Sequence, residues 1–506
     1  MSLPWHEPAT ALTPAFLSIC EALLRGLYWG QWVLLTPLSC LALHKLFVGL
    51  YARLSAQHDG ALPHYYFNAG APHTPSVTVQ LPIFNEPLVV LRLLEAVIEL
   101  DYPYACLEIQ VLDDSTDCTA TLIDGFIAAL PNDAPPVSVL RRTDRTGFKA
   151  GALQAGLLKA SGEFIAVFDA DFVPPSDFLL KTIALFDDPT VGVVQGRWGF
   201  INAHQNLLTR AEAALLSIHF GLEQAGRSAA GLFLNFNGSG GIWRRAAIEA
   251  SGGWSADTLT EDLDLSYRAQ LIGWRFRYVD SIEVPSELPA DLQSFCSQQR
   301  RWTVGAAQVF RKSIGAVWRS EVPLLVRLDA SLHLLQNAAF PLLILSLFTT
   351  VLHAGILYLS ADFESAASST SITLLYGAGM MVYVTTMLLA PLPHCSSWTG
   401  RLRDVGLGWL VALGMSLHNS AAFLEGLWGT SLPFIRTPKC GSILSPPKES
   451  PLNIRSALSE FTLVILLLCA AAATLSIGAH SSALMLSFFA ISFLFFGIAK
   501  TGAVRL

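Results

Sequence analysis

Apolar stretches of about 20 residues recur along the chain and are separated by segments of mixed polarity. A helix that crosses a bilayer needs about 20 consecutive apolar residues. The stretches that meet this length are Leu27–Leu46, Asn337–Leu359, Ile372–Leu392, Phe461–Ala479 and Ser482–Ala499. The pattern therefore predicts an integral, multi-pass membrane protein.

Three further segments leave the number of membrane helices open. Asp404–Leu427 is apolar enough to cross a bilayer, but we interpret it as a helix that lies along the membrane interface. A sixth span is the alternative. A second interface helix is predicted near Ser313–Val326, and residues 12–26 form either another interface helix or an additional span.

The long segment between the first two spans has the composition of a soluble domain, with strand-like and helix-like stretches in alternation. This alternation predicts an α/β fold. We therefore expect an N-terminal membrane segment over residues 1–60 and the α/β domain over residues 61–312. Residues 313–506 then contain the interface helices and the remaining transmembrane helices, so that the α/β domain is inserted between transmembrane α-helices.

The distribution of basic residues predicts the orientation in the membrane. Lys and Arg are absent between Arg327 and Arg401, and again between Arg455 and Lys500. Because cytoplasmic loops retain Lys and Arg, each gap fits two helices that cross the bilayer and return. The α/β domain is then expected in the cytosol, at a bacterial inner or plasma membrane or at a Golgi-type membrane.

Composition excludes some partners and supports others. The chain is 52% hydrophobic and 14% charged, with a net charge of −7 at pH 7. A generally basic surface is thus excluded, so nucleic acid is not an expected partner, whereas a lipid bilayer is. The eight cysteines include no C-x-x-C pair, which indicates neither a zinc site nor a disulfide framework.

Three short apolar runs, which we interpret as strands, are each followed by acidic residues. The runs are Val77–Leu81, Ile109–Leu112 and Phe164–Phe168. The acidic residues are Glu86, Asp113, Asp114, Asp169 and Asp171. Ligands of an open parallel sheet bind outside the carboxyl ends of its strands. We therefore expect these residues to converge on one nucleotide-binding crevice.

Asp169 and Asp171 are the predicted metal ligands. They are two positions apart, and in extended chain both carboxylates lie on the same face. Paired hard oxygen ligands suit Mg²⁺ or Mn²⁺ bound to a diphosphate. A D-x-D pair is equally typical of a solvated turn, but its place directly after a buried strand favours the metal site.

Two loops offer groups for phosphate and sugar. Lys149 lies in R-T-G-F-K-A-G, just before a helix-like run, where its ammonium group can approach phosphate oxygens. Asn237 and Gly238 lie in the small-residue turn F-N-G-S-G-G, where a sugar ring can approach the backbone. The alternatives are an exposed loop for the first segment and a plain tight turn for the second.

A base and an aromatic–basic motif complete the candidate site. Glu261 and Asp262 stand ahead of an amphipathic stretch, and we predict that Asp262 takes the proton of an acceptor hydroxyl, with Glu261 as its neighbour. Gln298 and Arg301 are three positions apart, hence on one face of a helix, and Trp302 follows. Arg can clamp a diphosphate and Trp can stack on a sugar, although an Arg/Trp cluster beside the membrane is the alternative.

Taken in order, these motifs resemble the D, D-x-D, T-E-D, Q-x-x-R-W series of processive family 2 glycosyltransferases, which include the cellulose, chitin and hyaluronan synthases. The motifs cover about Val77 to Arg311. The stretches D-D-S-T-D, F-N-G-S-G-G-I-W-R and T-E-D-L-D-L-S-Y-R-A-Q-L-I-G-W are most similar to the cellulose-synthase-like A branch, the glucomannan β-mannosyltransferases.

The resemblance implies a GT-A (Rossmann-like) fold and inverting, processive transfer of a hexose from a nucleotide sugar, GDP-mannose or UDP-glucose. The acceptor would be a growing β-1,4-linked glycan that crosses the membrane between the C-terminal helices. Donor contacts are expected from Glu86, Asp113 or Asp114, Lys149, Asp169 and Arg301. Acceptor contacts are expected from Gln298, Trp302, Asn237 and Gly238.

A last segment, F-I-R-T-P-K, is similar to the F-x-V-T-x-K gating loop of bacterial cellulose synthase, with Arg436 in place of the valine. The resemblance implies that Phe434, Thr437 and Lys439 belong to a lid that closes over the nucleotide and excludes water.

Two other functions fit parts of the sequence. A non-processive, ceramide-type lipid glucosyltransferase resembles the same motif series, but the several C-terminal spans and the lid-like loop favour the polymerase. A transporter or a non-catalytic scaffold is the other alternative. It is disfavoured because all four motifs are intact and the spans contain almost no ionisable residue apart from Lys45.

Overall fold

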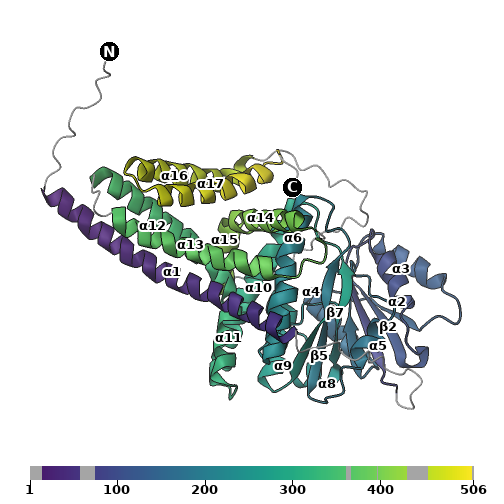
Figure 1. Cartoon of the computed structure of the whole chain (residues 1–506). Coiled ribbons are helices and arrows are strands. Elements are labelled where there is room, and N and C mark those ends of the chain that lie inside the picture. Colours follow the sequence, from purple (N-terminus) through teal and green to yellow (C-terminus); the bar gives the residue numbers. More distant parts are fainter. Residues whose placement is uncertain (1–13, 57–73, 361–365, 396, 430–453, 504–506) are drawn as a thin grey trace.

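The computed structural model describes residues 14–56, 74–360, 366–395, 397–429 and 454–503. A sheet covered by helices lies at one end of the molecule, and long helices lie beside it (Figure 1). The lid residues Phe434, Thr437 and Lys439 fall outside the described residues, so their assignment stays a prediction.

One sheet of seven strands, in the order β3-β2-β1-β4-β6-β5-β7, organises the α/β part. The strands are β1 (Val77–Ile83), β2 (Leu107–Asp113), β3 (Val137–Leu140), β4 (Phe164–Val167), β5 (Val191–Phe200), β6 (Gly241–Arg244) and β7 (Arg275–Ser286). The three predicted strands are confirmed as β1, β2 and β4, and β1 pairs in parallel with β2 on one side and with β4 on the other.

The sheet is mixed, although the three strands predicted from the sequence pair in parallel. β6 runs antiparallel to both β4 and β5. The reason is the small-residue turn that precedes β6, where the Gly240 N–H donates to the Val167 carbonyl at 3.0 Å. Because this turn lies against the carboxyl end of β4, β6 begins there and runs in the opposite direction.

Alternate side chains of each strand enter two separate cores, as the two-residue period of a strand requires. On one face, Val77 and Val79 of β1 pack beneath the first set of helices. That set is α2 (Val90–Ile98), α3 (Thr119–Ala128) and α5 (Phe178–Ile183). On the other face, Ile165 and Val167 of β4 pack beneath the second set. That set is α4 (Phe148–Leu157), α8 (Arg245–Ala250) and α9 (Glu261–Leu271).

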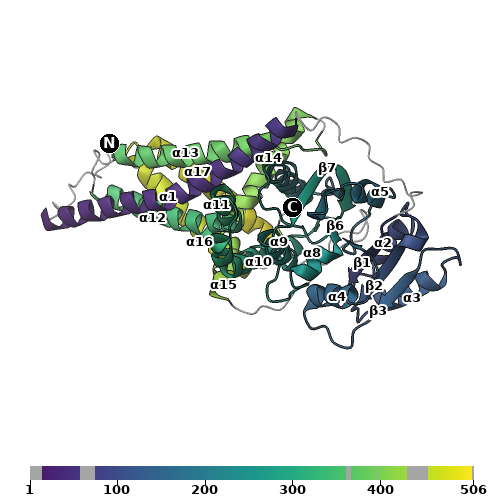
Figure 2. The ribbon, with the colours of Figure 1, turned by 90° about the horizontal axis from the view of Figure 1, so that it is seen from below.

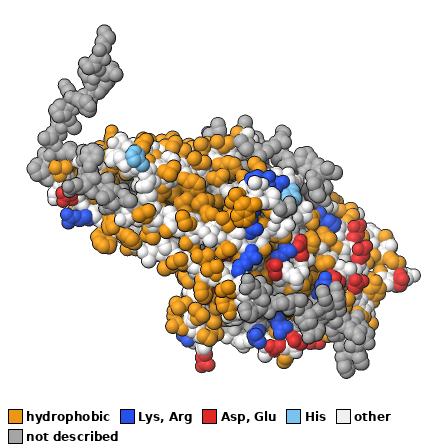
Figure 3. Space-filling view, viewed as in Figure 1, with side chains coloured by type: hydrophobic (Ala, Val, Ile, Leu, Met, Phe, Trp, Pro, Cys, Tyr) orange, Lys and Arg blue, Asp and Glu red, His pale blue; other side chains and the backbone are white. Residues whose placement is uncertain are grey.

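Each predicted span overlaps a helix that is long and apolar enough to cross a membrane, although the predictions Asn337–Leu359, Ile372–Leu392 and Phe461–Ala479 extend two or three residues past one end of their helices. These helices are α1 (Pro14–Ala56), α12 (Ala339–Ser360), α13 (Ala366–Leu389), α16 (Leu458–Ser476) and α17 (His480–Lys500). Figure 2 shows α1 lying alongside α12 and α13. In Figure 3, hydrophobic side chains cover this helical part, whereas charged side chains gather over the sheet. Residues 14–26 belong to α1 and form no separate helix.

Two segments that were each predicted as one interface helix are divided between two helices in the structure. Asp404–Leu427 is divided between α14 (Trp398–Gly414) and α15 (Ser416–Trp428), which meet at a bend of 53°. Taken together, the bent pair is a candidate sixth span by length and composition. The segment near Ser313–Val326 is divided between α10 (Leu292–Arg319) and α11 (Leu324–Leu334), because Pro323 cannot continue a helix.

A further run of helices connects the sheet with the membrane helices. It consists of α6 (Leu207–Ile218), the π-helix η2 (His219–Gln224) and α7 (Ala225–Ala230). Short 3-10 turns are η1 (Tyr104–Cys106), η3 (Gln336–Ala338) and η4 (Ile454–Ala457). α1 packs along η2 and α7, so the first membrane helix contacts the catalytic part directly.

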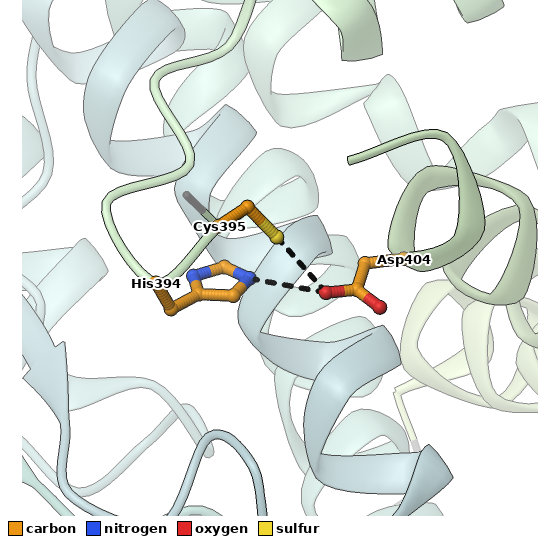
Figure 4. Close-up of side chains that lie close together, drawn as sticks. All are labelled: His394, Cys395 and Asp404. Carbon is orange, nitrogen blue, oxygen red and sulfur yellow. Dashed lines mark hydrogen bonds and ion pairs between the residues drawn. The ribbon is translucent and has the colours of Figure 1, made fainter. Parts of the chain in front are cut away.

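Asp404 of α14 has a fully buried side chain. Figure 4 shows it facing His394 and Cys395. The Cys395 thiol donates to Oδ2 at 3.0 Å, Arg403 Nε donates to Oδ1 at 2.8 Å, and Arg210 of α6 lies 3.8 Å away. His394 and Cys395 are metal-ligating residue types, and the His394 Nε2 atom is 4.0 Å from Oδ2. Because two guanidinium groups already face this carboxylate, we interpret the cluster as an ion-pair anchor.

The contact between α1 and α7 depends on a glycine. A side chain at Gly226 would meet the carbonyl oxygen of Val48. We expect Gly226→Ala to lower the free energy of unfolding by about 1–3 kcal/mol, the usual cost of overpacking, measured by thermal unfolding in detergent. Gly125 in α3 has open space around it, so Gly125→Ala is the matched control. An unchanged melting temperature in Gly226→Ala contradicts the prediction.

Candidate active site

A crevice of about 150 Å³ lies at the carboxyl ends of β1, β2 and β4. It is the crevice that the strand endings predicted, and its wall is completed by the turn before β6, the start of α9 and one face of α10. The predicted residues that line it are Glu86, Asp114, Lys149, Asp169, Asp171, Asn237, Gly238, Glu261, Asp262, Gln298, Arg301 and Trp302.

Asp113 does not line the crevice. Its carboxylate is fully buried, where it accepts from Arg141 Nε at 2.8 Å and from the Ser115 N–H at 3.0 Å. Asp114 lines the crevice instead and accepts from Arg142 Nε at 3.0 Å. Of the two acidic residues left open by the sequence, the structure therefore brings only Asp114 to the crevice.

Asp169 and Asp171 lie in a turn, whereas the sequence predicted extended chain. β4 ends at Val167, and the Phe172 N–H donates to the Asp169 carbonyl at 3.0 Å, which closes the turn. The Asp169 N–H also donates to Ser239 Oγ at 2.9 Å, which ties this turn to the turn before β6. Both carboxylates nevertheless line the crevice, and the donor set consists of the hard oxygens that Mg²⁺ and Mn²⁺ prefer.

Lys149 joins the acidic groups of the crevice. It lies in the first turn of α4, directly after the left-handed Gly147, whose φ is 75°. Its ammonium group is 2.6 Å from Asp169 Oδ1 and 3.8 Å from Glu261 Oε1, and it donates to the Gly238 carbonyl at 2.9 Å. Burial alone would lower the pKa of Lys149, but these carboxylates raise it above its ordinary value. Lys149 therefore provides a permanent positive charge.

Asp262 is the predicted general base. Its Oδ1 accepts from the Leu263 N–H at 2.8 Å, within the first turn of α9. Burial and the neighbouring Glu261 carboxylate raise the pKa of Asp262 to about 7, against the opposing charges of Lys149 and Arg301. A carboxyl group with a pKa near the working pH is well matched to proton transfer.

Asp262 also stands where two cavities meet. A second cavity of about 290 Å³ adjoins the crevice. The residues that line both are Trp198, Leu216, Asn237, Thr260, Asp262 and Trp302. A third, mostly apolar cavity of about 240 Å³ lies among α1, α12, α13 and α14, and shares Lys45, Phe340 and Tyr383 with the second.

Trp198 and Glu287 are among the lining residues that the sequence-based prediction missed. Trp198 of β5 lines both cavities, and its Nε1 donates to the Ser239 carbonyl at 3.0 Å. Glu287 accepts from Arg92 at 3.0 Å. Glu287 directly follows β7, so the rule that identified acidic residues after the other strands also applies to it. No motif around Trp198 marks it in the sequence.

Acidic residues at the strand ends, with a buried lysine among them, form the crevice that the resemblance to GT-A glycosyltransferases predicted. The family model described as "Glycosyl transferase family group 2" matches residues 164–392. The chain belongs to the family of the glucomannan 4-beta-mannosyltransferases, as the relatives below establish.

Three plant proteins illustrate this relationship. "Probable glucomannan 4-beta-mannosyltransferase 2" of Oryza sativa subsp. japonica is 33% identical over 85% of this chain and 74% of its own length. "Glucomannan 4-beta-mannosyltransferase 7" of Arabidopsis thaliana is 34% identical over 74% of this chain and 66% of its own length. "Probable glucomannan 4-beta-mannosyltransferase 3" of Oryza sativa subsp. japonica is 44% identical over 50% of this chain and 47% of its own length. The chain thus matches only about half of this last relative.

The fold is shared with a solved structure, the "Mannosyltransferase PcManGT from Pyrobaculum calidifontis in complex with GDP-Man and Mn2+". That structure aligns with 79% of this chain and 100% of its own, with a TM-score of 0.54 and 21% sequence identity. The predicted GT-A fold is confirmed by this likeness.

Proposed function

We propose that the protein is an inverting, processive transferase that moves mannose from GDP-mannose to a growing β-1,4-linked glycan. The names of the plant relatives and the GDP-Man bound to the solved neighbour support this donor, with UDP-glucose as the alternative. The observation on which the proposal depends is the place of Asp262, at the junction between the crevice and the second cavity.

The chemistry follows from this placement. The acceptor hydroxyl attacks the anomeric carbon of the donor sugar while the Asp262 carboxylate takes the hydroxyl proton. The bond between the anomeric carbon and the diphosphate oxygen breaks, and the nucleoside diphosphate leaves with the bonding electrons. Lys149 and Arg301 offset its negative charge. A single displacement of this kind inverts the anomeric configuration.

The other lining residues bind and orient the two substrates in this proposal. Glu86 and Asp114 contact the donor, and Gln298, Trp302 and Asn237 contact the acceptor. Asp169 and Asp171 hold Mg²⁺ or Mn²⁺, which when bound offsets charge on the diphosphate. Glu261 lies beside the base, and its carboxylate adds to the effect of burial in raising the pKa of Asp262.

The same proposal gives the glycan a route into the membrane. The crevice, the second cavity and the third cavity adjoin through shared lining residues and end among α1, α12 and α13. A chain extended at Asp262 therefore has space to advance toward the membrane helices. The proposal also includes a cytosolic orientation of the α/β domain, which the distribution of basic residues supports. It includes a domain division at residues 60 and 312, which the apolar stretches support.

The deciding experiment compares donors with the purified protein in lipid nanodiscs. GDP-mannose, UDP-glucose and UDP-N-acetylglucosamine are supplied in turn with Mg²⁺ or Mn²⁺, and the length of the radiolabelled product is measured. Long polymer from GDP-mannose is the expected result. Polymer from UDP-glucose alone would identify UDP-glucose as the donor. A lipid that carries a single sugar would show that the protein is a lipid glycosyltransferase and not a polymerase.

The pH dependence of the reaction tests the base. Because the pKa of Asp262 is raised to about 7, the fraction of ionised carboxylate falls as the pH falls through that value. We expect kcat/KM for GDP-mannose to decline about tenfold per pH unit below about pH 6. Thermal melting at each pH controls for unfolding. A rate that stays level down to pH 5 contradicts the assignment, since an ordinary carboxyl group is still ionised there.

A further inference from the structure

A connected series of polar side chains runs from α1 to the turn that lines the active site. The Lys45 ammonium of α1 is 2.5 Å from Glu223 Oε1. The other oxygen of Glu223 is 3.5 Å from His219 Nδ1, and His219 Nε2 is 2.9 Å from Asn237 Oδ1. Three of these four residues lie outside every motif identified in the sequence.

The middle of this series is a buried carboxylate. The Glu223 side chain is only 8% exposed. Burial alone would raise its pKa, but Lys45 and His219 outweigh that effect and hold the pKa of Glu223 well below its usual range. An ionised group in a low-dielectric site interacts strongly with its partners, and His219 Nδ1 lies 3.5 Å from this carboxylate.

The consequence appears at the Asn237 side chain. Its Oδ1 accepts from two donors, His219 Nε2 at 2.9 Å and Asn235 Nδ2 at 2.7 Å. Its Nδ2 is buried and has no hydrogen-bond partner among the described residues. Since an amide carries its acceptor and its donors on opposite sides, two donors at Oδ1 fix the orientation of the NH₂ group.

The position of Asn237 places its NH₂ group where it can contact a substrate. Asn237 lines both the crevice and the second cavity, next to Asp262 and Trp302. A buried NH₂ group without a partner is costly, and a sugar hydroxyl is the acceptor that a glycan in the second cavity would offer. The NH₂ group is therefore available to an acceptor hydroxyl.

The local backbone supports the same interpretation. His219 and Glu223 belong to the π-helix η2, and both line the second cavity. π-helical turns are rare in proteins, but those that occur are often found at functional sites. Such a turn changes which side chains face one side of a helix. Here it is followed by α7, whose Gly226 packs against α1.

We propose that His219 is a positioning residue: held by Glu223 and Lys45, it fixes the Asn237 amide so that the NH₂ group donates to a hydroxyl of the acceptor glycan. This proposal rests on the proposed function, because it requires a glycan in the second cavity. It also makes α1 a direct support of the acceptor site.

The test separates acceptor binding from donor binding. Transfer of mannose to a soluble β-1,4-linked manno-oligosaccharide is measured in nanodiscs for the wild type and for His219→Ala, His219→Gln and Glu223→Gln. His219→Ala is expected to raise the acceptor KM about tenfold, the loss typical of one hydrogen bond, with the GDP-mannose KM unchanged. His219→Gln is expected to recover part of that loss, because its amide also donates. His204→Ala is the control, since His204 is exposed and lines neither cavity.

Three results overturn the proposal. The first is a fall in kcat of His219→Ala with the KM values for acceptor and GDP-mannose unchanged. The second is an equal rise in these two KM values. The third is an acceptor KM of His219→Gln as high as that of His219→Ala. If His219→Ala does not fold, Glu223→Gln takes its place, and its expected result is a rise in acceptor KM of about threefold. A wild-type protein that transfers no mannose overturns the proposed function itself, whereas an active wild type with unaltered variants overturns this proposal alone.

Discussion

Asp262→Asn is expected to abolish polymer synthesis, with a loss of about 10²- to 10⁴-fold in kcat, the contribution typical of a general base. The substitution preserves the size of the side chain, so donor affinity and the melting temperature should change little. Glycan synthesis and nucleotide binding, measured on the same nanodisc preparation, separate the two effects.

The matched control is Glu249→Gln, the same carboxyl-to-amide change at an exposed residue of α8 that pairs with Arg245 at 2.7 Å. We expect full activity from it. An Asp262→Asn variant that retains more than a tenth of wild-type activity would mean that another group takes the proton, and Glu261 would be the first alternative.

The second large effect is expected from Gly238→Ala. Gly238 has a φ of 78°, and a Cβ atom there would lie 2.7 Å from Asp262 Oδ2. The new methyl group must displace either the base or the turn, and a displacement of about 1 Å in an active site can cost about 10²-fold in rate. We therefore expect kcat to fall about 100-fold.

Gly231→Ala provides the control for backbone strain. Gly231 also has a positive φ, 65°, but a Cβ atom there would meet no described atom within 4 Å. It should lose some stability and keep its activity. If both variants lose the same fraction of kcat, the cause of the loss is the positive φ of the glycine and not the approach of the new Cβ atom to Asp262.

Local patterns in the sequence were sufficient to predict where the crevice lies and which acidic and basic residues line much of it. A short apolar run followed by acidic residues is visible within ten positions, and β1, β2 and β4 all present it. Q-x-x-R-W likewise depends only on helical spacing, and α10 brings Gln298, Arg301 and Trp302 to one wall. Short-range periodicity is the strongest signal that a single sequence contains.

Features that depend on distant parts of the chain were not predictable in the same way. Lys45 and Glu223 are 178 positions apart, and neither has a neighbouring residue that signals the pairing. The direction of β6 depends on where the preceding turn meets β4. Pro323, in contrast, was a local signal that should have divided the predicted helix at Ser313–Val326, and the burial of Asp113 was decided by its pairing with Arg141.

The length of α1 has a mechanical consequence. Its 43 residues extend about 64 Å at 1.5 Å per residue, roughly twice the thickness of the hydrocarbon layer. The contacts of α1 with η2 and α7 include Val48 and Gly49, near its C-terminal end. A helix longer than the hydrocarbon layer must tilt or extend into water, so we expect the length of α1 to set the distance between the reaction centre and the lipid, and that distance to change with bilayer thickness.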